Sequence, residues 1–318
     1  MNAEERQTWL ERRRTGLGGT DIAKIIVNAA PHEARAGSYK GSLFSMWAEK
    51  VGLNLRTDHE MPAYAKRGLM LESYVCHLYE EAVGPIEMWE PGLIEHPVCP
   101  LVRGTPDRMV KCKTTGAEWG MDAKTRRSRR GWGEDGSSLV PLDTEIQMRV
   151  YMEVCDKPHW DVATLFGLDD FRVYRLHRDE YMGRDIIHIA QVWWEQHVVK
   201  EVPPEADSAT GTKELLAKLH RDPTIELRES TQEERELHER LLAVRAKHKK
   251  LSEEKAALEN QMRAKIGDDL GITGIATWKP QKAAKVIDSA RLKSEAPEIY
   301  EKFSKERNHS RTLRIIGD

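Results

Sequence analysis

The sequence predicts an α/β fold in which a mixed central β-sheet is flanked by helices, followed by a C-terminal extension with one long helix. Two observations predict the sheet. A pair of strand-like runs lies within residues 103–124, and two more β-rich runs, 160–168 and 171–177, are joined by an Asp-Asp turn. Segments with the apolar spacing of helices lie before, between and after these runs. This order is typical of an α/β core.

Apolar spacing and capping residues place the helices of that core. We expect helices at 4–13 and 20–27 around a glycine-rich turn, with Thr20 or Asp21 as the cap of the second one. The other expected core helices are 41–52, 64–83, 144–154 and 179–198.

The clearest linker is 200–212, which holds a Pro pair and small polar residues. It divides the chain into a core, 1–205, and an extension, 206–318. In the extension, 231–266 carries apolar residues at alternating spacings of four and three, interrupted by His248 and Lys255. This heptad pattern predicts a long helix that pairs with a second helix, within the chain or in another copy. Short β-like runs, 275–279 and 311–316, surround a further helix at about 288–303.

Composition excludes several classes of protein. The net charge of −2 argues against a protein that coats polyanions in general, although a local basic patch can still bind nucleic acid. No apolar run approaches the roughly 20 residues of a membrane span, and the N-terminus has no signal-peptide core. Four scattered cysteines form no C-x-x-C pair, which argues against zinc or an iron–sulfur cluster. We expect a cytoplasmic protein without a membrane partner.

The most informative stretch is 101–124, LVRGTPDRMVKCKTTGAEWGMDAK. Asp107 follows a Gly-Thr-Pro, and the second run ends in Asp122-Ala-Lys124. Because side chains alternate along a strand, Asp122 and Lys124 point the same way. If the runs pair as a hairpin, two carboxylates and one ammonium converge, a pattern that suits Mg²⁺ or Mn²⁺ and phosphodiester hydrolysis. The alternative is a pair of solvated residues at the edge of a sheet.

Two further polar residues lie on apolar helix faces. Glu72 shares the stripe of the 64–83 helix, where an unpaired carboxylate is costly unless a cation or hydrogen bonds compensate it. A metal ion would do so, and a salt bridge to an Arg is the alternative. Gln147 occupies a similar position on the 144–154 helix.

Two basic segments are candidates for contact with phosphate. Three arginines, 12–14, precede a helix whose free N–H groups form an anion site, although solvated arginines at a helix junction are equally expected. The loop 125–143 is rich in Arg, Gly and Ser and suits contact with a DNA backbone. A flexible solvated loop is the competing interpretation. Its candidate residues are Arg126, Arg127, Arg129, Arg130 and Trp132.

Residues 8–200 resemble the YqaJ-type phage recombination nucleases, relatives of lambda exonuclease in the PD-(D/E)-x-K superfamily. The resemblance lies in short motifs that occur in order: WLERRRTGLGGTD, RGLMLE, GTPD, DAK and EIQMRVYMEV. Each motif is weak alone, and the order and spacing together are fairly specific. The tail also looks like the extension of longer phage members.

The resemblance implies a role for each matching residue. Glu72, Asp107 and Asp122 would be the metal carboxylates, with the carbonyl of Ala123 as a further ligand. Lys124 would position the water or stabilise developing charge, and Gln147 would orient the water or a ligand. Arg13 and Thr20 match the family's pocket for the 5′-terminal phosphate. The chain departs from the family at Asp122, where Glu is usual, and the shorter carboxylate can change metal distance or preference.

The implied function is a Mg²⁺- or Mn²⁺-dependent exonuclease of phage or prophage recombination. It would digest duplex DNA from 5′ ends and leave 3′ single strands for a single-strand annealing protein. Family members often form rings, so we expect a homo-oligomer. One alternative is a structure-specific or restriction-type endonuclease on the same fold. The other is a non-catalytic DNA-binding scaffold that works through the heptad helix, which the retention of all three acids and the Lys argues against.

Overall fold

The computed structural model describes residues 11–53, 63–221, 226–280, 287–304 and 313–316. It divides into two compact units, Met1–Leu219 and His220–Asp318. The division follows helix α7 (Thr210–Leu219), which lies within the segment predicted to belong to the extension. The predicted boundary near residue 205 stays a prediction.

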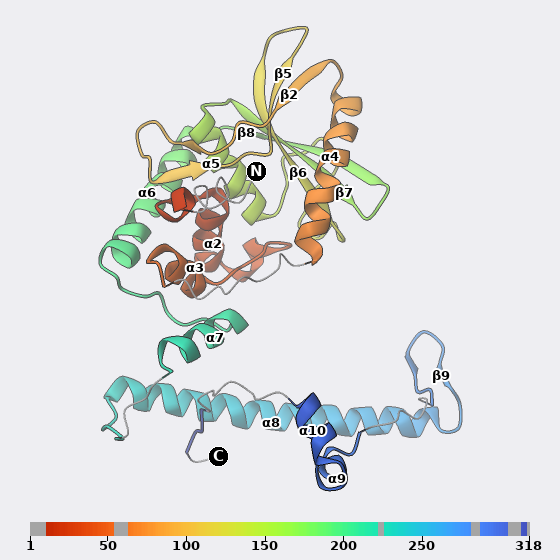
Figure 1. Ribbon diagram of the computed structural model, residues 1–318. Coiled ribbons are helices and arrows are strands. Elements are labelled where there is room, and N and C mark those ends of the chain that lie inside the picture. Colours follow the sequence, from red (N-terminus) through yellow and green to blue (C-terminus); the bar gives the residue numbers. More distant parts are fainter. Residues whose placement is uncertain (1–10, 54–62, 222–225, 281–286, 305–312, 317–318) are drawn as a thin grey trace. The chain divides into compact units, whose positions relative to one another are not determined.

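A five-stranded mixed sheet forms the centre of the first unit (Figure 1). Its order is β2-β5-β6-β7-β8, in which β6 and β7 are parallel and every other pair is antiparallel. The predicted hairpin is present: β5 pairs with β6, with Arg108 opposite Met121. The strands are β2 (Ile86–Trp89), β5 (Arg108–Cys112), β6 (Glu118–Arg126), β7 (His159–Phe166) and β8 (Asp170–His177).

Helices cover both faces of this sheet, as the sequence predicts. One face packs against α4 (Ala63–Val83) through an apolar cluster that includes Tyr79, Met121 and Leu165. The other face packs against a larger cluster that includes Trp160 and Val162. Helices on that side are α2 (Gly19–Ala29), α3 (Leu43–Lys50), α5 (Leu142–Cys155) and α6 (Glu180–Trp193). Neighbouring apolar side chains of β7 belong to different clusters, because successive side chains of a strand point to opposite faces of the sheet.

A small three-stranded sheet connects the N-terminal turn with the segment before Asp107. β1 (Leu17–Gly18) pairs in parallel with β4 (Val102–Gly104), which also pairs with β3 (Ile94–Glu95). Arg103 fixes this junction, because its guanidinium donates to the Thr15 hydroxyl at 3.1 Å and to the Pro100 carbonyl at 2.8 Å. The N-terminal turn is thereby held beside the GTPD motif.

Several elements differ from the predicted ones. The predicted helix 179–198 is α6 followed by a π-helical turn, Trp194–Val199. A 3₁₀ turn, His32–Arg35, lies between α2 and α3. Most of the predicted helix 4–13 lies outside the described residues. The described part of it begins at residue 11, and residues 11–14 are helical.

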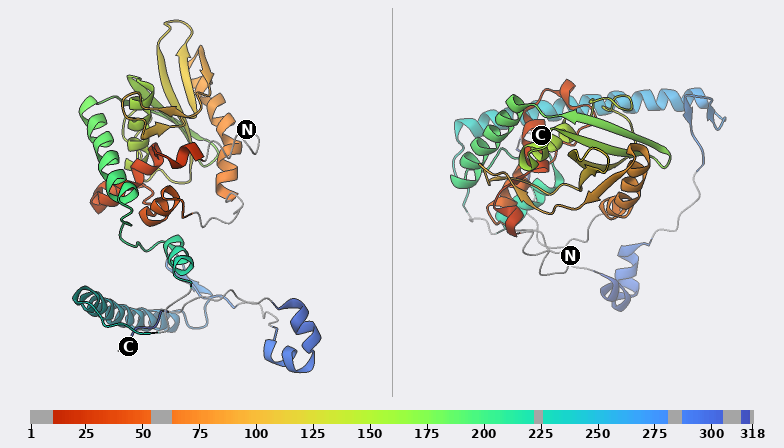
Figure 2. Two further views of the ribbon diagram at one scale, coloured as in Figure 1. Left: turned by 60° about the vertical axis from the view of Figure 1, so that its left-hand side comes forward. Right: turned by 90° about the horizontal axis from the view of Figure 1, so that it is seen from above.

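The second unit contains α8 (Gln232–Ile266), a continuous helix of 35 residues (Figure 2). Its predicted range was 231–266, and Thr231 forms a capping box with Glu234. A hairpin, β9 (Gly271–Ile272) and β10 (Ala276–Thr277), covers part of the run predicted at 275–279. Residues 313–316 of the other predicted run are not strand, and 311–312 lie outside the described residues.

The single helix predicted at 288–303 is divided into α9 (Ser289–Glu295) and α10 (Pro297–Phe303). Pro297 has no N–H to continue the first helix, and it stands where proline is favoured, at the start of the next one. In the parts of the chain described above, no helix is long and apolar enough to cross a membrane.

Candidate active site

The candidate site lies where β4 ends and β6 runs past it. Asp107 follows the Thr105-Pro106 turn between β4 and β5, and its Oδ2 accepts a hydrogen bond from the Ala123 backbone N–H at 2.9 Å. That bond holds the first carboxylate beside the DAK segment. The predicted convergence of Asp107, Asp122 and Lys124 is therefore present in the fold.

Asp122 is buried, and only one of its two carboxylate oxygens contacts a positive charge. The Lys124 ammonium contacts its Oδ2, as expected for two side chains on the same face of β6. Its Oδ1 is buried and has no hydrogen-bond partner among the described residues. A buried carboxylate oxygen without a partner is costly. This oxygen is therefore suited to accept a cation.

The charge of Asp122 also acts on Asp107. Burial and the neighbouring Asp122 carboxylate raise the pKa of Asp107 to about 8, although Lys124 and the Ala123 N–H act in the opposite direction. Two carboxylates this close resist ionising together. The residues present fit a divalent cation, since its charge would favour both carboxylates in their ionised form.

Gln147 connects the charged pair to helix α5. Its Oε1 accepts from Lys124 Nζ at 3.2 Å, and its Nε2 donates to the Tyr151 hydroxyl at 2.8 Å. The Tyr151 hydroxyl donates in turn to the Thr105 carbonyl at 3.3 Å. Gln147 and Tyr151 are both buried. This chain of hydrogen bonds fixes the Lys124 ammonium relative to the turn that carries Asp107.

Tyr151 was not among the predicted site residues. It stands one helical turn after Gln147, at the i+4 position where two side chains meet. The spacing is visible in the sequence, but a Tyr on an apolar stripe is usually only part of a core.

Glu72 does not join the two aspartates. Its Oε1 accepts from Arg108 Nη1 at 3.0 Å, and Arg108 also lies 3.2 Å from Glu90 Oε1. The described residues contain no group of three acidic, His or Cys side chains arranged to hold a metal. The salt bridge to an Arg, left open from the sequence, is what the fold contains. Arg108, which follows Asp107 directly, was not predicted to take part.

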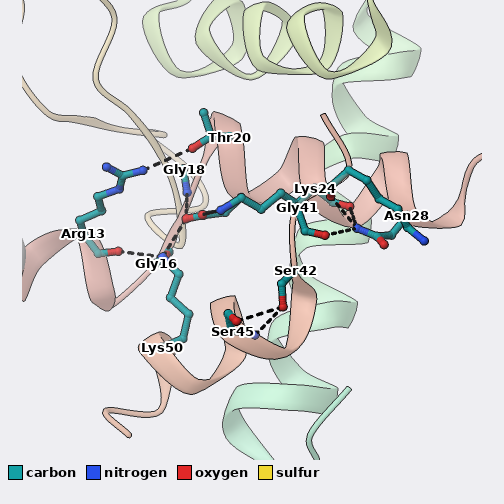
Figure 3. Close-up of polar contacts among 12 residues, drawn as sticks. Arg13, Gly16, Gly18, Thr20, Lys24, Asn28, Gly41, Ser42, Ser45 and Lys50 are labelled. Carbon is teal, nitrogen blue, oxygen red and sulfur yellow. Dashed lines mark hydrogen bonds and ion pairs between the residues drawn. The ribbon is translucent and has the colours of Figure 1, made fainter. Parts of the chain in front are cut away.

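Arg13 and Thr20 lie together at the start of α2. Arg13 Nη2 donates to Thr20 Oγ1 at 3.3 Å, and Figure 3 shows the guanidinium reaching across the glycine turn to the hydroxyl. The predicted cap of this helix was wrong, because Gly18 is the N-cap and Thr20 lies inside the first turn. Asp21 accepts instead from the Gly18 N–H at 3.2 Å.

A buried ion pair supports this turn. Lys50 Nζ lies 2.8 Å from Asp21 Oδ2 and also donates to the carbonyls of Gly16 at 2.7 Å and Arg13 at 3.1 Å (Figure 3). Burial acts to raise the pKa of Asp21, but Lys50, Lys24 and Arg13 outweigh it and lower that pKa to about 2. Lys50 was not singled out in the sequence, where it is one charged residue of an amphipathic helix.

The start of α2 and the carboxylate group are neighbours. A Cβ atom on Gly19 would stand 3.1 Å from Gln147 Cγ and 3.1 Å from Tyr151 Cε1. Gly104 is equally close to the ring of Tyr151, with a Cβ at 2.8 Å from Cδ1. The Arg13–Thr20 pair therefore begins a helix that packs directly on the residues holding Lys124.

The basic loop divides into exposed and buried residues. Arg127, Arg129 and Arg130 are exposed, and Arg129 lies 3.7 Å from Asp170. Trp132 is buried against the rings of Phe166 and Tyr174. The half-buried guanidinium of Arg126 lies 5.8 Å from the Trp132 ring centre. Trp132 thus anchors the loop, while three arginines face solvent.

Comparison with known proteins agrees with the resemblance to YqaJ-type nucleases that the sequence motifs indicate. Residues 8–158 match the profile of the YqaJ-like viral recombinase domain. This segment, slightly less than half of the chain, is similar to that domain. A curated relative, "Uncharacterized protein YqaJ" of Bacillus subtilis (strain 168), is 26% identical over 323 residues, which cover 96% of this chain and 93% of the relative.

Solved structures with some likeness include two nucleases. An alkaline exonuclease (LHK-Exo) from Laribacter hongkongensis aligns with a TM-score of 0.44 and 14% identity, covering 68% of this chain and 98% of that chain. A phage related exonuclease from Haemophilus somnus 129PT aligns with a TM-score of 0.38 and 14% identity. The alignment covers 59% of this chain and 96% of that chain. The YqaJ-like segment contains every candidate residue from Arg13 to Gln147.

Proposed function

We propose that the chain is a metal-dependent DNA exonuclease of phage or prophage recombination. In this proposal it hydrolyses phosphodiesters from the 5′ ends of duplex DNA and leaves 3′ single strands for an annealing protein. The observation that carries the proposal is the buried Asp122, whose Oδ1 has no partner among the described residues, beside Asp107 and Lys124 in a YqaJ-like domain. A buried carboxylate oxygen is costly unless a cation or a hydrogen bond compensates it, which supports a bound cation here.

Asp107 and Asp122 would hold the cation, Mg²⁺ or Mn²⁺, with the Ala123 carbonyl as a further donor. The cation supplies Lewis-acid stabilisation of the phosphodiester oxygens and of the nucleophile. Glu72 could take part only by leaving its ion pair with Arg108. Its role as a third carboxylate ligand therefore depends on an exchange of partners.

Lys124 would stabilise the charge that develops on the phosphoryl group. Its ammonium is held between Asp122 and Gln147, so little reorganisation is needed when that charge appears. Gln147 would keep the ammonium in place and orient the attacking water. The hydrogen bond to Tyr151 leaves the Gln147 amide with a single orientation.

The Arg13–Thr20 pair would bind the 5′-terminal phosphate. A guanidinium and a hydroxyl at the first turn of a helix match a phosphate dianion, which the helix N-terminus also attracts. Since this turn packs on Gln147 and Tyr151, a bound terminal phosphate would set the distance from the DNA end to Asp107 and Asp122. The exposed arginines 127, 129 and 130 would contact the backbone farther along the duplex.

The test is digestion of a linear duplex labelled at its 5′ or 3′ ends, with Mg²⁺, with Mn²⁺ and with chelator. We expect early release of 5′ label, no release with chelator, and an intact closed circular duplex. Cleavage of the closed circle would replace the exonuclease with the endonuclease alternative. Absence of any metal-dependent cleavage would leave a DNA-binding role and overturn the proposal.

A further inference from the structure

Helix α8 presents a line of apolar residues that nothing described in its unit covers. Leu237, Val244 and Leu251 are each about 60% exposed, and Leu258 is 57% exposed. Ile266 is the one buried residue of the helix. With two polar residues that interrupt it, the line is called the α8 seam here and consists of Leu237, Leu241, Val244, His248, Leu251, Lys255, Leu258 and Met262.

The spacing of the α8 seam fits one kind of partner. Its residues alternate at four and three over the length of the helix, which is the pattern of a helix that pairs with another helix along its whole length. A helix of 35 residues with almost no buried side chain gains little from packing within its own unit. The charged residues beside the seam then decide the direction of the partner.

A parallel pairing of two α8 helices in register is unfavourable. In such a pair, each of the residues 240, 247 and 254 lies near the residue five places later in the partner helix. Arg240 would therefore meet Arg245, and Glu254 would meet Glu259. The two polar seam positions would also face their own copies, so that His248 meets His248 and Lys255 meets Lys255.

An antiparallel pairing removes these conflicts. When Leu241 faces Leu258 of the second copy, all eight seam residues overlap, and Leu237 faces Met262 of the second copy. His248 then faces Leu251, and Lys255 faces Val244, so no polar seam residue meets another. A shift by one heptad brings Lys247 against Lys247 and Arg245 against Arg245 in one direction, and Glu254 against Glu254 in the other.

The flanking charges favour this same register. Lys247 faces Glu254 of the second copy, and the two-fold symmetry produces this pair twice. Arg240 meets Gln261 and Arg245 meets Ser252, which are neutral partners. His238, whose Nε2 lies 2.9 Å from the Ile316 carbonyl, would face Glu259. Every flanking pair in this register is attractive or neutral.

We propose that the α8 seam is the contact of an antiparallel homodimer, with Leu241 against Leu258 and Lys247 against Glu254 of the second copy. The partner is a second copy of this chain, and the pairing rests on side chains of α8 alone. It does not depend on the proposed nuclease chemistry. Two nuclease cores would then be joined by one shared pair of helices.

The first test is the self-association of the full-length protein, measured by sedimentation equilibrium. Leu258→Asp puts a charge into the seam at two places per dimer, and we expect self-association to weaken by at least about a hundredfold. Ala246→Asp is the matched control, because Ala246 is exposed on the opposite side of the same helix. A purely monomeric wild-type protein, or equal association in both variants, would overturn the proposal.

The second test distinguishes the direction of the helices by exchanging charges. Lys247→Glu alone places two carboxylates opposite each other across the dimer, and Glu254→Lys alone places two ammonium groups opposite each other. We expect each variant to associate roughly tenfold more weakly at low salt, and a mixture of the two to recover wild-type association as a heterodimer.

A parallel contact would give a different result. Residue 247 would face Ser252, so Lys247→Glu would change little, and Glu254→Lys would strengthen association by meeting Glu259. Failure of the mixture to recover would exclude the antiparallel register. Circular dichroism of each variant checks that the helix itself is retained.

Discussion

At the scale of single residues, the candidate site joins three charged side chains with unequal surroundings. Asp107 is held by a backbone N–H, Asp122 has one oxygen without a described partner, and Lys124 is held by Asp122 and Gln147. The sequence could predict the first three of these residues because strand alternation and a hairpin turn determine which side chains converge. It could not predict the ion pair of Glu72, since Arg108 and Glu72 are brought together only by the packing of α4 on the sheet.

Removal of either Asp107 or Lys124 should abolish cleavage. Asp107→Ala removes a cation ligand and Lys124→Ala removes preorganised positive charge, and such groups are each worth about 10²–10³ in rate. We expect losses of at least that size in digestion of end-labelled duplex, with circular dichroism and duplex binding largely unchanged. Lys113→Ala, at an exposed lysine in the β5–β6 turn, is the control and should keep full activity. Variants within tenfold of wild type would remove this group from the mechanism.

Arg13 should determine preference for a phosphorylated end. A guanidinium beside a helix N-terminus binds a phosphate dianion far better than a neutral hydroxyl. Wild-type protein should therefore digest a 5′-phosphorylated duplex faster than a 5′-hydroxyl duplex, and Arg13→Ala should make the two rates equal. Arg14→Ala changes the exposed neighbour and should retain the preference. Equal rates on both ends in the wild-type protein would contradict the phosphate pocket.

The Asp21–Lys50 pair should make the stability of the first unit sensitive to acid. The pKa of Asp21 is about 2 in the folded chain and 3.8 ordinarily, so its contribution is complete above about pH 4 and is lost as pH falls through about 2. Asp21→Asn also leaves Lys50 buried without its partner, which costs roughly 3–5 kcal/mol at pH 7. In urea unfolding, the free energy of unfolding should differ between wild type and Asp21→Asn, and this difference should become smaller from pH 4 to pH 2.

Glu33→Gln, at an exposed carboxylate, provides the comparison for that measurement. It should change the free energy of unfolding little at either pH. A difference between wild type and Asp21→Asn that stayed constant down to pH 2 would show that the ion pair contributes no acid sensitivity.

At the scale of elements, the predicted strands of the central sheet and the predicted helix α8 are present, whereas β1, β2 and β3 were not predicted. The five-stranded sheet includes β2, whose four residues have no distinctive alternation. β1 and β3 have two residues each and exist because Arg103 and the backbone of β4 hold them. No local pattern of two residues can predict a strand. Pro297 divides α9 from α10, and the prediction of a single helix at 288–303 overlooked it.

Two glycines within elements should respond oppositely to alanine. A Cβ on Gly120 of β6 would stand 2.1 Å from the ring of Trp160, so Gly120→Ala should destabilise the protein by about 1–3 kcal/mol or more. A Cβ on Gly68 of α4 meets nothing within 4 Å, so Gly68→Ala should stabilise by about 0.5–1 kcal/mol. Thermal unfolding measures both. A Gly120→Ala variant as stable as wild type would contradict the close packing of Trp160 on β6.

At the scale of the whole molecule, the chain consists of two units with different kinds of stabilisation. The first unit, up to Leu219, has two apolar clusters on the faces of its sheet. The second contains the long helix α8, whose seam would be covered by a second copy in the proposed pairing. The division predicted at the Pro-rich linker, near residue 205, stays a prediction. That linker did not indicate α7, whose first three residues, 210–212, lie within the predicted linker range of 200–212.

The contacts of α7 determine where the chain can be shortened. Thr212 is buried, its hydroxyl lies 3.0 Å from Ser42 Oγ, and Leu215 belongs to the main apolar cluster. A chain ending at 219 should therefore keep metal-dependent hydrolysis of short duplexes while its oligomeric state or processivity changes. A chain ending at 205 loses the packing of Leu215 and should unfold at a lower temperature, consistent with about 2–5 kcal/mol for a buried Leu.

Light scattering, thermal unfolding and a short-duplex digestion assay on both shortened chains separate these effects. The 1–219 chain lacks α8 and should differ from the full chain in association. The 1–205 chain also lacks α7 and should differ from the 1–219 chain in stability. Leu215→Ala in the full-length protein is the control for the second step and should reproduce part of the stability loss without altering association. An insoluble or inactive 1–219 chain would mean that residues after 219 complete the nuclease fold, and the two units would then have to be treated as one.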